Sequence, residues 1–310
     1  MAANGVCIIE PPEMESRRAT RSWRHTRHTG RRLGWGVADQ AVSSLTNFAV
    51  NIYIVRHLGA AQYGAFALAY VTYGFVLQAS RGLATDPLLV RYSGKDVPTW
   101  RRAVSSAAGT ATLTGLVGGG LVLVVAALLN GPTRMAFLAL GVTLPLLMLQ
   151  DSWRFAFFAL GRGSQAFLND TVWAVSLVVA LVYLRYAGLS NVFWYVFAWG
   201  AAAGIGAAVG LLQTRAIPKV SGAREWLSRQ RDLGFRYLVE GTSYSAAGLV
   251  RNYGIGLILG LTALGYIQAA NTLMGPFQVI FCRPRGCDFE FMEPLTARVF
   301  CAWDKLVRLT

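Results

Sequence analysis

Apolar residues along the chain gather in eight stretches, each close to the length of a membrane-spanning helix. They cover approximately residues 36–55, 60–80, 103–129, 135–160, 167–187, 190–213, 236–259 and 262–281. An α-helix of about 20 apolar residues crosses the roughly 30 Å of hydrocarbon in a bilayer. Gly and Ala recur within these stretches and suit close helix packing. The pattern predicts an all-α, polytopic membrane protein with about eight transmembrane helices.

Composition and charge support this prediction. Of the 310 residues, 54% are hydrophobic and 14% are charged, and the mean hydropathy is +0.42. The net charge of +14 is one-sided, because 24 of the 29 Lys and Arg residues fall in segments that the predicted crossings leave on the same side. By the positive-inside rule, both termini are expected to be cytoplasmic, in a multi-pass protein of the inner or plasma membrane. We therefore interpret the basic charge as a topology signal and predict no nucleic-acid partner.

The same patterns divide the chain into five parts. Residues 1–34 carry charges without an apolar core and are expected to form a disordered basic cytoplasmic tail, whereas residues 282–310 lose the Gly/Ala-rich apolar texture. We predict an N-terminal six-helix lobe at 35–213, a cytoplasmic basic loop at 214–234, the first two helices of a second lobe at 235–281, and an atypical cytoplasmic tail at 282–310.

The cysteines and histidines do not form a metal-binding pattern. Cys7, Cys282, Cys287 and Cys301 lie in or beside predicted cytoplasmic segments, where thiols stay reduced. The spacing of Cys282 and Cys287 fits zinc motifs poorly, and no second ligand pair accompanies it. We predict no disulfide, no metal site and no cofactor.

An internal repeat is the most informative feature of the sequence. Residues 38–70 align without gaps with residues 239–271 at an offset of 201, and seven of the 33 positions are identical, against roughly two or three expected from composition. Both copies carry an LG-x4-G motif, expected in an extracellular turn. Six predicted helices separate the copies, so the two halves should share one orientation and be related by an axis along the membrane normal. The identities include Asn51, Gly59 and Gly64, which match Asn252, Gly260 and Gly265.

Three segments resemble a known family. "HLGAAQYGAFALA", "SRGLATDPLLVRYSG" and "LQDSWRFAFFALGR" are similar to polysaccharide biosynthesis or lipid-linked oligosaccharide flippases, of the multidrug/oligosaccharidyl-lipid/polysaccharide exporter superfamily. The resemblance implies two six-helix lobes that rock about a cavity and move an undecaprenyl-pyrophosphate-linked sugar, with a glycan polymerase or glycosyltransferases as partners. This sequence covers the first lobe and only the first hairpin of the second. We therefore expect that the chain alone does not flip lipid and that 282–310 is not native transporter structure.

Charges inside the apolar stretches are the candidate substrate ligands. Asp151 and Arg154 are three residues apart on one predicted helix and are expected to neutralise each other partly. In one interpretation Arg154, oriented by Asp151, and Arg251 supply positive potential to a cavity for pyrophosphate. In the other, Arg154 snorkels to the cytoplasmic interface and Arg251 pairs with Glu240.

Polar residues of the repeat are weaker candidates. Asn51 and Asn252 occupy equivalent positions, where an amide binds either a sugar or a neighbouring helix, and we favour helix packing. Asp39 and Glu240 are candidates for proton or sodium coupling. Their predicted positions near helix starts also suit the positive end of the helix dipole, which we favour.

Arg81 and Arg91 bracket "GLATDPLLV", predicted to be a short segment along the inner surface. There they either meet a lipid pyrophosphate or snorkel to the interface. The functional prediction is thus a lipid-linked oligosaccharide flippase and no enzyme. The alternatives are a cation antiporter of the same superfamily, which requires acids deep in a cavity, and a membrane glycan polymerase or ligase, which requires a large extracellular loop.

Overall fold

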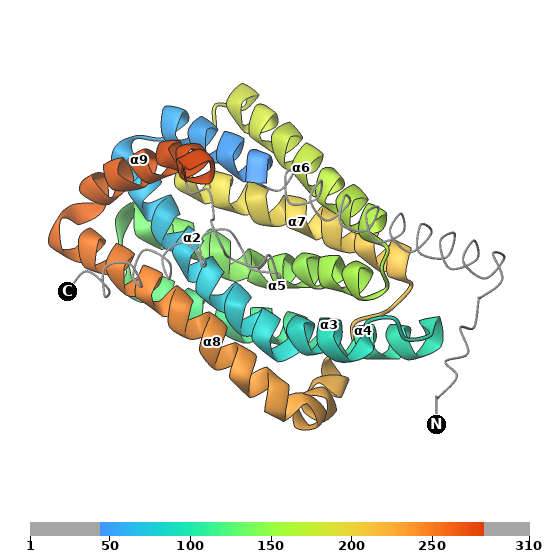
Figure 1. Ribbon diagram of the computed structural model, residues 1–310. Helices are drawn as coiled ribbons and strands as arrows, with labels where there is room; N and C mark the ends of the chain where they lie inside the picture. The colour runs from blue at the N-terminus through green and yellow to red at the C-terminus, as the bar shows by residue number, and fades with distance from the viewer. Residues whose placement is uncertain (1–43, 282–310) are drawn as a thin grey trace, which may run out of the picture.

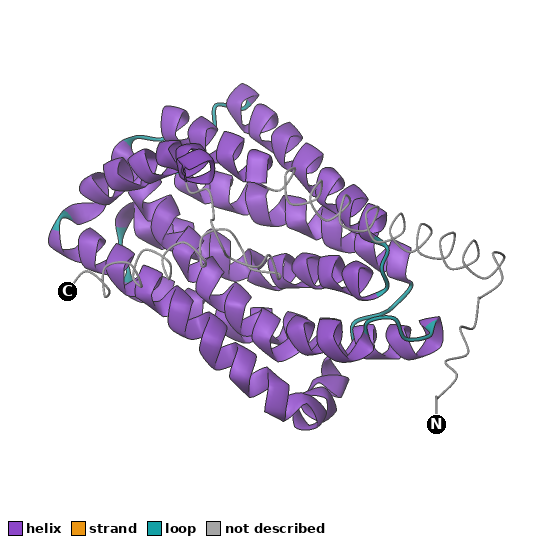
Figure 2. Cartoon of the chain, viewed as in Figure 1, coloured by secondary structure: helices purple, strands orange, loops and turns teal. Residues whose placement is uncertain are grey.

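The described chain consists of helices and short loops (Figure 2). The computed structural model describes residues 44–281, and of residues 273–281 the backbone alone; no strand occurs in this part of the chain. A helical segment, residues 44–57, precedes the labelled helices. Those are α2 (Ala60–Ser80), a π-helical turn (Arg81–Thr85), α3 (Asp86–Tyr92), α4 (Val97–Leu128), α5 (Gly131–Ala159), α6 (Gly163–Tyr186), α7 (Val192–Thr214), α8 (Ala223–Ile258) and α9 (Gly260–Phe281). The predicted all-α class is confirmed.

Five of the described helices are long and apolar enough to cross a membrane, which indicates a membrane-embedded protein. They are Ala60–Tyr92, α4, α5, α6 and α7. Large apolar side chains such as Leu121 on α4 and Val179 on α6 are more than 60% exposed, as expected for surfaces that face lipid. The helix α8 is not among the five, because its last 18 residues contain Thr242, Ser243, Arg251, Asn252 and several glycines and tyrosines, which lower their mean hydropathy. By this criterion the structure supports five crossings, fewer than the eight predicted.

The helix α5 packs against α2, α4, α6 and α7 (Figure 1). Glycines of α4 allow the backbones of α4 and α5 to come close together. Pro145 has no N–H, so the carbonyl of Gly141 one turn earlier has no helical donor. Gly119 of α4 meets that carbonyl, because a Cβ atom on Gly119 would lie only 2.4 Å from the Gly141 oxygen. Gly115, one turn before Gly119, meets Pro145 itself, so these two glycines bring α4 and α5 into backbone contact.

The segment "GLATDPLLV" is not the separate surface segment that the sequence predicts, because it belongs to a longer helix. Ala60–Tyr92 is one continuous helix with a π-helical turn at Arg81–Thr85. Pro87 lies in the first turn of α3 and cannot donate to the carbonyl of Leu83. The indole nitrogen of Trp226 in α8 donates to that carbonyl at 3.1 Å. The helix therefore continues past the proline because another helix satisfies the freed backbone oxygen.

The predicted basic loop at 214–234 is also shorter than expected. The helix α8 begins at Ala223, and only residues 215–222 connect it to α7. At about 1.5 Å per residue, its 36 residues span about 54 Å, well beyond the hydrocarbon thickness. The charged residues between 223 and 236 predict a polar segment, and a helix accommodates them as well as a loop does. The tails predicted at 1–34 and 282–310 lie outside the described residues.

The two copies of the repeat pack against each other reciprocally. A Cβ atom on Gly64 would lie 2.0 Å from the carbonyl oxygen of Leu261, and one on Gly265 would lie 2.1 Å from that of Ala60. The offset of 201 relates Ala60 to Leu261 and Gly64 to Gly265, so exchanging the two copies converts one contact into the other. Contacts that exchange in this way define a local two-fold axis between α2 and α9.

The glycines of the LG-x4-G motif therefore differ in role from the prediction. Gly64 and Gly265 lie inside α2 and α9 and serve helix packing, not the turn. Of the two turn glycines, Gly260 adopts φ 84°, which favours glycine, whereas Gly59 has φ −61°, which any residue adopts. Only the second hairpin needs glycine for its turn.

We predict that Gly64→Ala loosens α9 from α2, because the new methyl group would collide with the Leu261 carbonyl. Gly74→Ala is the matched control. Gly74 lies on the same helix, and a Cβ atom there would meet nothing within 4 Å. Gly64→Ala should cost about 1–3 kcal/mol of unfolding free energy, as overpacking does. Thermal unfolding in detergent and hydrogen exchange of α9 amides measure the effect. Equal midpoints and equal exchange for the two variants would contradict the close contact.

Candidate functional site

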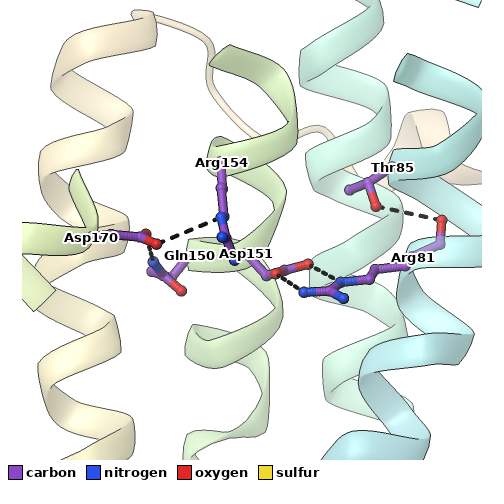
Figure 3. A network of polar contacts seen from close by, with 6 residues as sticks. All are labelled: Arg81, Thr85, Gln150, Asp151, Arg154 and Asp170. Carbon is purple, nitrogen blue, oxygen red and sulfur yellow. Dashed lines mark hydrogen bonds and ion pairs between the residues drawn. The ribbon is translucent and has the colours of Figure 1, made fainter. Parts of the chain in front are cut away.

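The buried charges form two ion pairs on opposite sides of α5 (Figure 3). Arg81, in the π-helical turn, donates to Asp151 through Nε at 3.1 Å and Nη2 at 2.9 Å. Its guanidinium carbon lies 5.1 Å from the ring centre of Phe155. Both side chains are nearly buried, with exposures of 11% and 8%. A bidentate contact fixes orientation as well as charge, so this pair ties the end of α2 to α5.

The second pair joins α5 to α6. The Nε atom of Arg154 lies 3.6 Å from Oδ2 of Asp170, and their side-chain exposures are 15% and 4%. The amide of Gln150 donates to the other carboxylate oxygen of Asp170 at 3.0 Å. Asp170 therefore meets a guanidinium and an amide from successive turns of α5, as Figure 3 shows.

The predicted pairing of Asp151 with Arg154 is thus wrong. Side chains three residues apart on a helix are close enough to pair, so the spacing alone does not exclude this contact. Each residue instead meets an oppositely charged partner on a different neighbouring helix. The helix α5 lies between α2 and α6, and the two diverging side chains reach opposite neighbours. Asp151 orients Arg81, and Arg154 is held by Asp170.

These pairs leave little net positive charge for an anion at this level. Asp151 lies about 30 Å along α5 from its first residue, Gly131, and about 12 Å before its end. Asp170 lies about 10 Å into α6, near the same end of the bundle. Two arginines and two aspartates balance each other there. Their geometry suits joining three helices in an apolar environment, where an unpaired charge is costly.

Arg91 also acts between helices. Its Nη1 atom donates to the Gln230 side chain at 2.8 Å and to the Arg229 carbonyl at 3.0 Å, and Nη2 donates to Asp232. These contacts hold α3 against the first turns of α8. Desolvation is the largest single effect on the pKa of Asp232 and would raise it, but the backbone hydrogen bonds from Leu233 and Asp232 and the Arg91 guanidinium together lower this pKa below its ordinary value.

The two repeat asparagines bind their own hairpins. Each side-chain amide donates to the carbonyl four residues earlier, at 2.8 Å in both copies. Each side-chain oxygen accepts from the next helix: Asn51 from Tyr63 at 3.2 Å, and Asn252 from Gln268 at 3.0 Å. This matches the helix-packing role that we favour, and whether either amide also binds substrate stays a prediction.

The remaining candidates lie elsewhere. Arg251 is exposed about 10 Å before the last residue of α8, and among the described side chains of residues 44–272 it makes no ion pair or side-chain hydrogen bond. Glu240 is also exposed and lies about 25 Å into α8, so the dipole role assigned to it is wrong, because the helix starts at Ala223. Glu240 and Arg251 are separated by about 16 Å along the helix. Asp39 lies outside the described residues.

Sequence reasoning missed Asp170 and Trp226. Asp170 is an acid inside an apolar stretch, the same signal that singled out Asp151, and it could have been found in that way. Trp226 was not recognisable as the donor to Leu83, since nothing in the sequence shows which helix approaches the proline. Trp100 and Trp153 act alike, donating to the carbonyls of Ala156 and Ala207 at 2.9 and 3.0 Å.

Comparisons with models of protein families, with curated proteins and with solved structures find no match. The functional interpretation therefore rests on the residues and contacts described above.

Arg154 should be energetically coupled to Asp170 and not to Asp151. A double-mutant cycle with Arg154→Leu and Asp170→Leu should give a coupling of about 1–3 kcal/mol in unfolding free energy. The matched cycle with Arg154→Leu and Asp151→Leu should give less than about 0.5 kcal/mol, because these side chains point to different helices. A larger coupling to Asp151 would overturn the observed pairing.

Proposed function

We propose that this chain is a membrane transporter component that moves a lipid-linked, pyrophosphate-bearing oligosaccharide across the membrane. In this proposal the segment 44–57, α2 and α4 to α7 form a six-helix lobe, and α8 with α9 forms the first hairpin of a second lobe. All eight helices cross the bilayer. The continuous helix α2–α3 counts as one crossing.

The two reciprocal contacts, Gly64 with Leu261 and Gly265 with Ala60, carry this proposal. Transporters with parallel repeats have two halves related by an axis along the membrane normal. In an eight-crossing chain, α2 and α9 both run from the outer to the inner side, so a two-fold contact between them is the expected junction of two such halves. The substrate class rests on the sequence resemblance and on Arg251, an exposed arginine within a helix assigned to the membrane. Such a charge normally faces protein or a water-filled cavity.

The contacts favour this function over the two alternatives. A cation antiporter requires available acids deep within the membrane, yet Asp151 and Asp170 each already hold an arginine, and Glu240 lies at the inner end of the proposed α8 crossing. A glycan polymerase requires a sizeable extracellular loop. The connections at the proposed outer end comprise residues 58–59, 129–130, 187–191 and 259 within the described chain, which leaves no room for such a loop.

The proposed topology predicts that Leu129 and Ala187 are external. Reporter fusions after each residue should report an extracytoplasmic location, because an odd number of crossings precedes both, and a fusion after Gly222 should report the cytoplasm. Cytoplasmic signals at both Leu129 and Ala187 would rule out the eight-crossing arrangement.

The substrate class predicts a specific binding experiment. The full chain in lipid nanodiscs should be labelled by a photoreactive polyprenyl-pyrophosphate oligosaccharide. Unlabelled polyprenyl pyrophosphate should compete, whereas a polyprenol without phosphate and a lipophilic cation should not. Arg251→Gln should weaken labelling about tenfold through loss of a charged hydrogen bond, and Arg251→Lys should restore it in part.

Two controls make this experiment decisive. Arg134→Gln removes a charge from the first turn of α5, an exposed position, and should leave labelling unchanged. Arg154→Gln should lower thermal stability more than affinity, because it deprives buried Asp170 of its guanidinium. Competition by the lipophilic cation alone would favour the antiporter, and labelling that no competitor reduces would refute the proposed substrate.

A further inference from the structure

The first turns of α8 have two faces of opposite character. One face is buried against α3 and the π-helical turn and consists of Ala223, Trp226, Gln230 and Gly234. The remaining surface is exposed. We call one strip of it the exposed face, which consists of Arg224, Ser228, Arg231, Phe235 and Val239. Asp232 lies beside this strip, and its carboxylate accepts a hydrogen bond from Arg91. Phe235 is 66% exposed, which is unusual for an aromatic side chain beside arginines on a water-facing helix.

Contacts on the buried face hold this register. The Trp226 indole is bound to the Leu83 carbonyl at 3.1 Å and stacks on Tyr92, with 5.7 Å between ring centres. Arg91 donates a hydrogen bond to the Gln230 side chain at 2.8 Å. Gly82 brings the two backbones together, because a Cβ atom there would lie 2.5 Å from the nitrogen of Leu238. The helix α8 cannot rotate without breaking these contacts, so the exposed face stays directed outward.

The exposed face changes from basic to apolar along the helix. If the last 20 residues of α8 span the hydrocarbon, Val239 lies at its inner boundary. Phe235 and Arg231 then lie about 6 and 12 Å beyond it. The headgroup layer is about 6 Å thick on each side, and an arginine side chain can reach back toward it by several Å. Phe235 would thus enter the interface, with Arg231 beside the lipid phosphates, whereas Arg224 lies about 22 Å beyond the boundary and adds only to the long-range positive potential.

We infer that this face of α8 binds the headgroups of anionic phospholipids in the inner leaflet. The partner follows from charge complementarity together with the exposed apolar residues, because amphipathic basic helices bind anionic bilayer surfaces in this way. Lys95, Arg101 and Lys219 are exposed at the same end of the bundle and add to its positive potential. The inference rests on the membrane orientation within the proposed function and not on the transported substrate.

The test measures lipid retention by the intact chain. The protein is purified from nanodiscs that contain equal amounts of phosphatidylglycerol and phosphatidylcholine, and native mass spectrometry counts the lipids that remain bound. The wild-type chain should retain phosphatidylglycerol preferentially, and 0.5 M salt should reduce this preference by screening. Arg231→Gln should weaken phosphatidylglycerol binding about fivefold.

Arg229→Gln is the matched control. It removes the same charge from the same turns, but the Arg229 side chain lies on another face and pairs with Glu225. This control should keep the wild-type preference. The inference is overturned if Arg231→Gln retains as much phosphatidylglycerol as the wild type, or if the control loses as much as Arg231→Gln. Since the assay contains no sugar lipid, its outcome is independent of the proposed substrate.

Discussion

Inside this bundle, buried charges and a carbonyl freed by proline take their partners from neighbouring helices. Pro87 frees the Leu83 carbonyl, and Trp226 binds it. Asp151 and Arg154 on α5 would be costly alone, and each is matched by a residue of another helix. Because these partners come from different helices, satisfying them fixes how α2, α5, α6 and α8 lie against one another.

Glycines provide the second constraint. Helices surrounded by lipid gain little from burying apolar surface, so close backbone contact becomes the main source of attraction between them. Gly119 allows α4 to approach the freed carbonyl of Gly141, and Gly64 and Gly265 allow α2 and α9 to approach each other. The second contact is reciprocal, and it links the internal sequence repeat to an arrangement of two halves. The proposed transport function follows from this link.

The helices could largely be predicted from the sequence, because apolar stretches of membrane length have few alternative structures. The stretch predicted at 60–80 is α2, and that at 262–281 is α9 to within two residues. The candidate site was harder to predict. Asp151 and Arg154 were correctly placed on one helix, but their partners depend on which helices flank α5. The start of α8 was missed because charged residues beyond the membrane fit a helix and a loop equally well.

Solid-state NMR on the chain in lipid bilayers tests the reciprocal packing most directly. With glycine labelled at Cα and leucine labelled at the carbonyl carbon, a carbon–carbon dipolar contact should join Gly64 to Leu261. With alanine carbonyls labelled instead, the equivalent contact should join Gly265 to Ala60. The account predicts both contacts with similar build-up rates. The two contacts are equivalent under the local two-fold axis, so their carbon–carbon distances should be similar. The absence of both contacts, or the presence of only one, would contradict it.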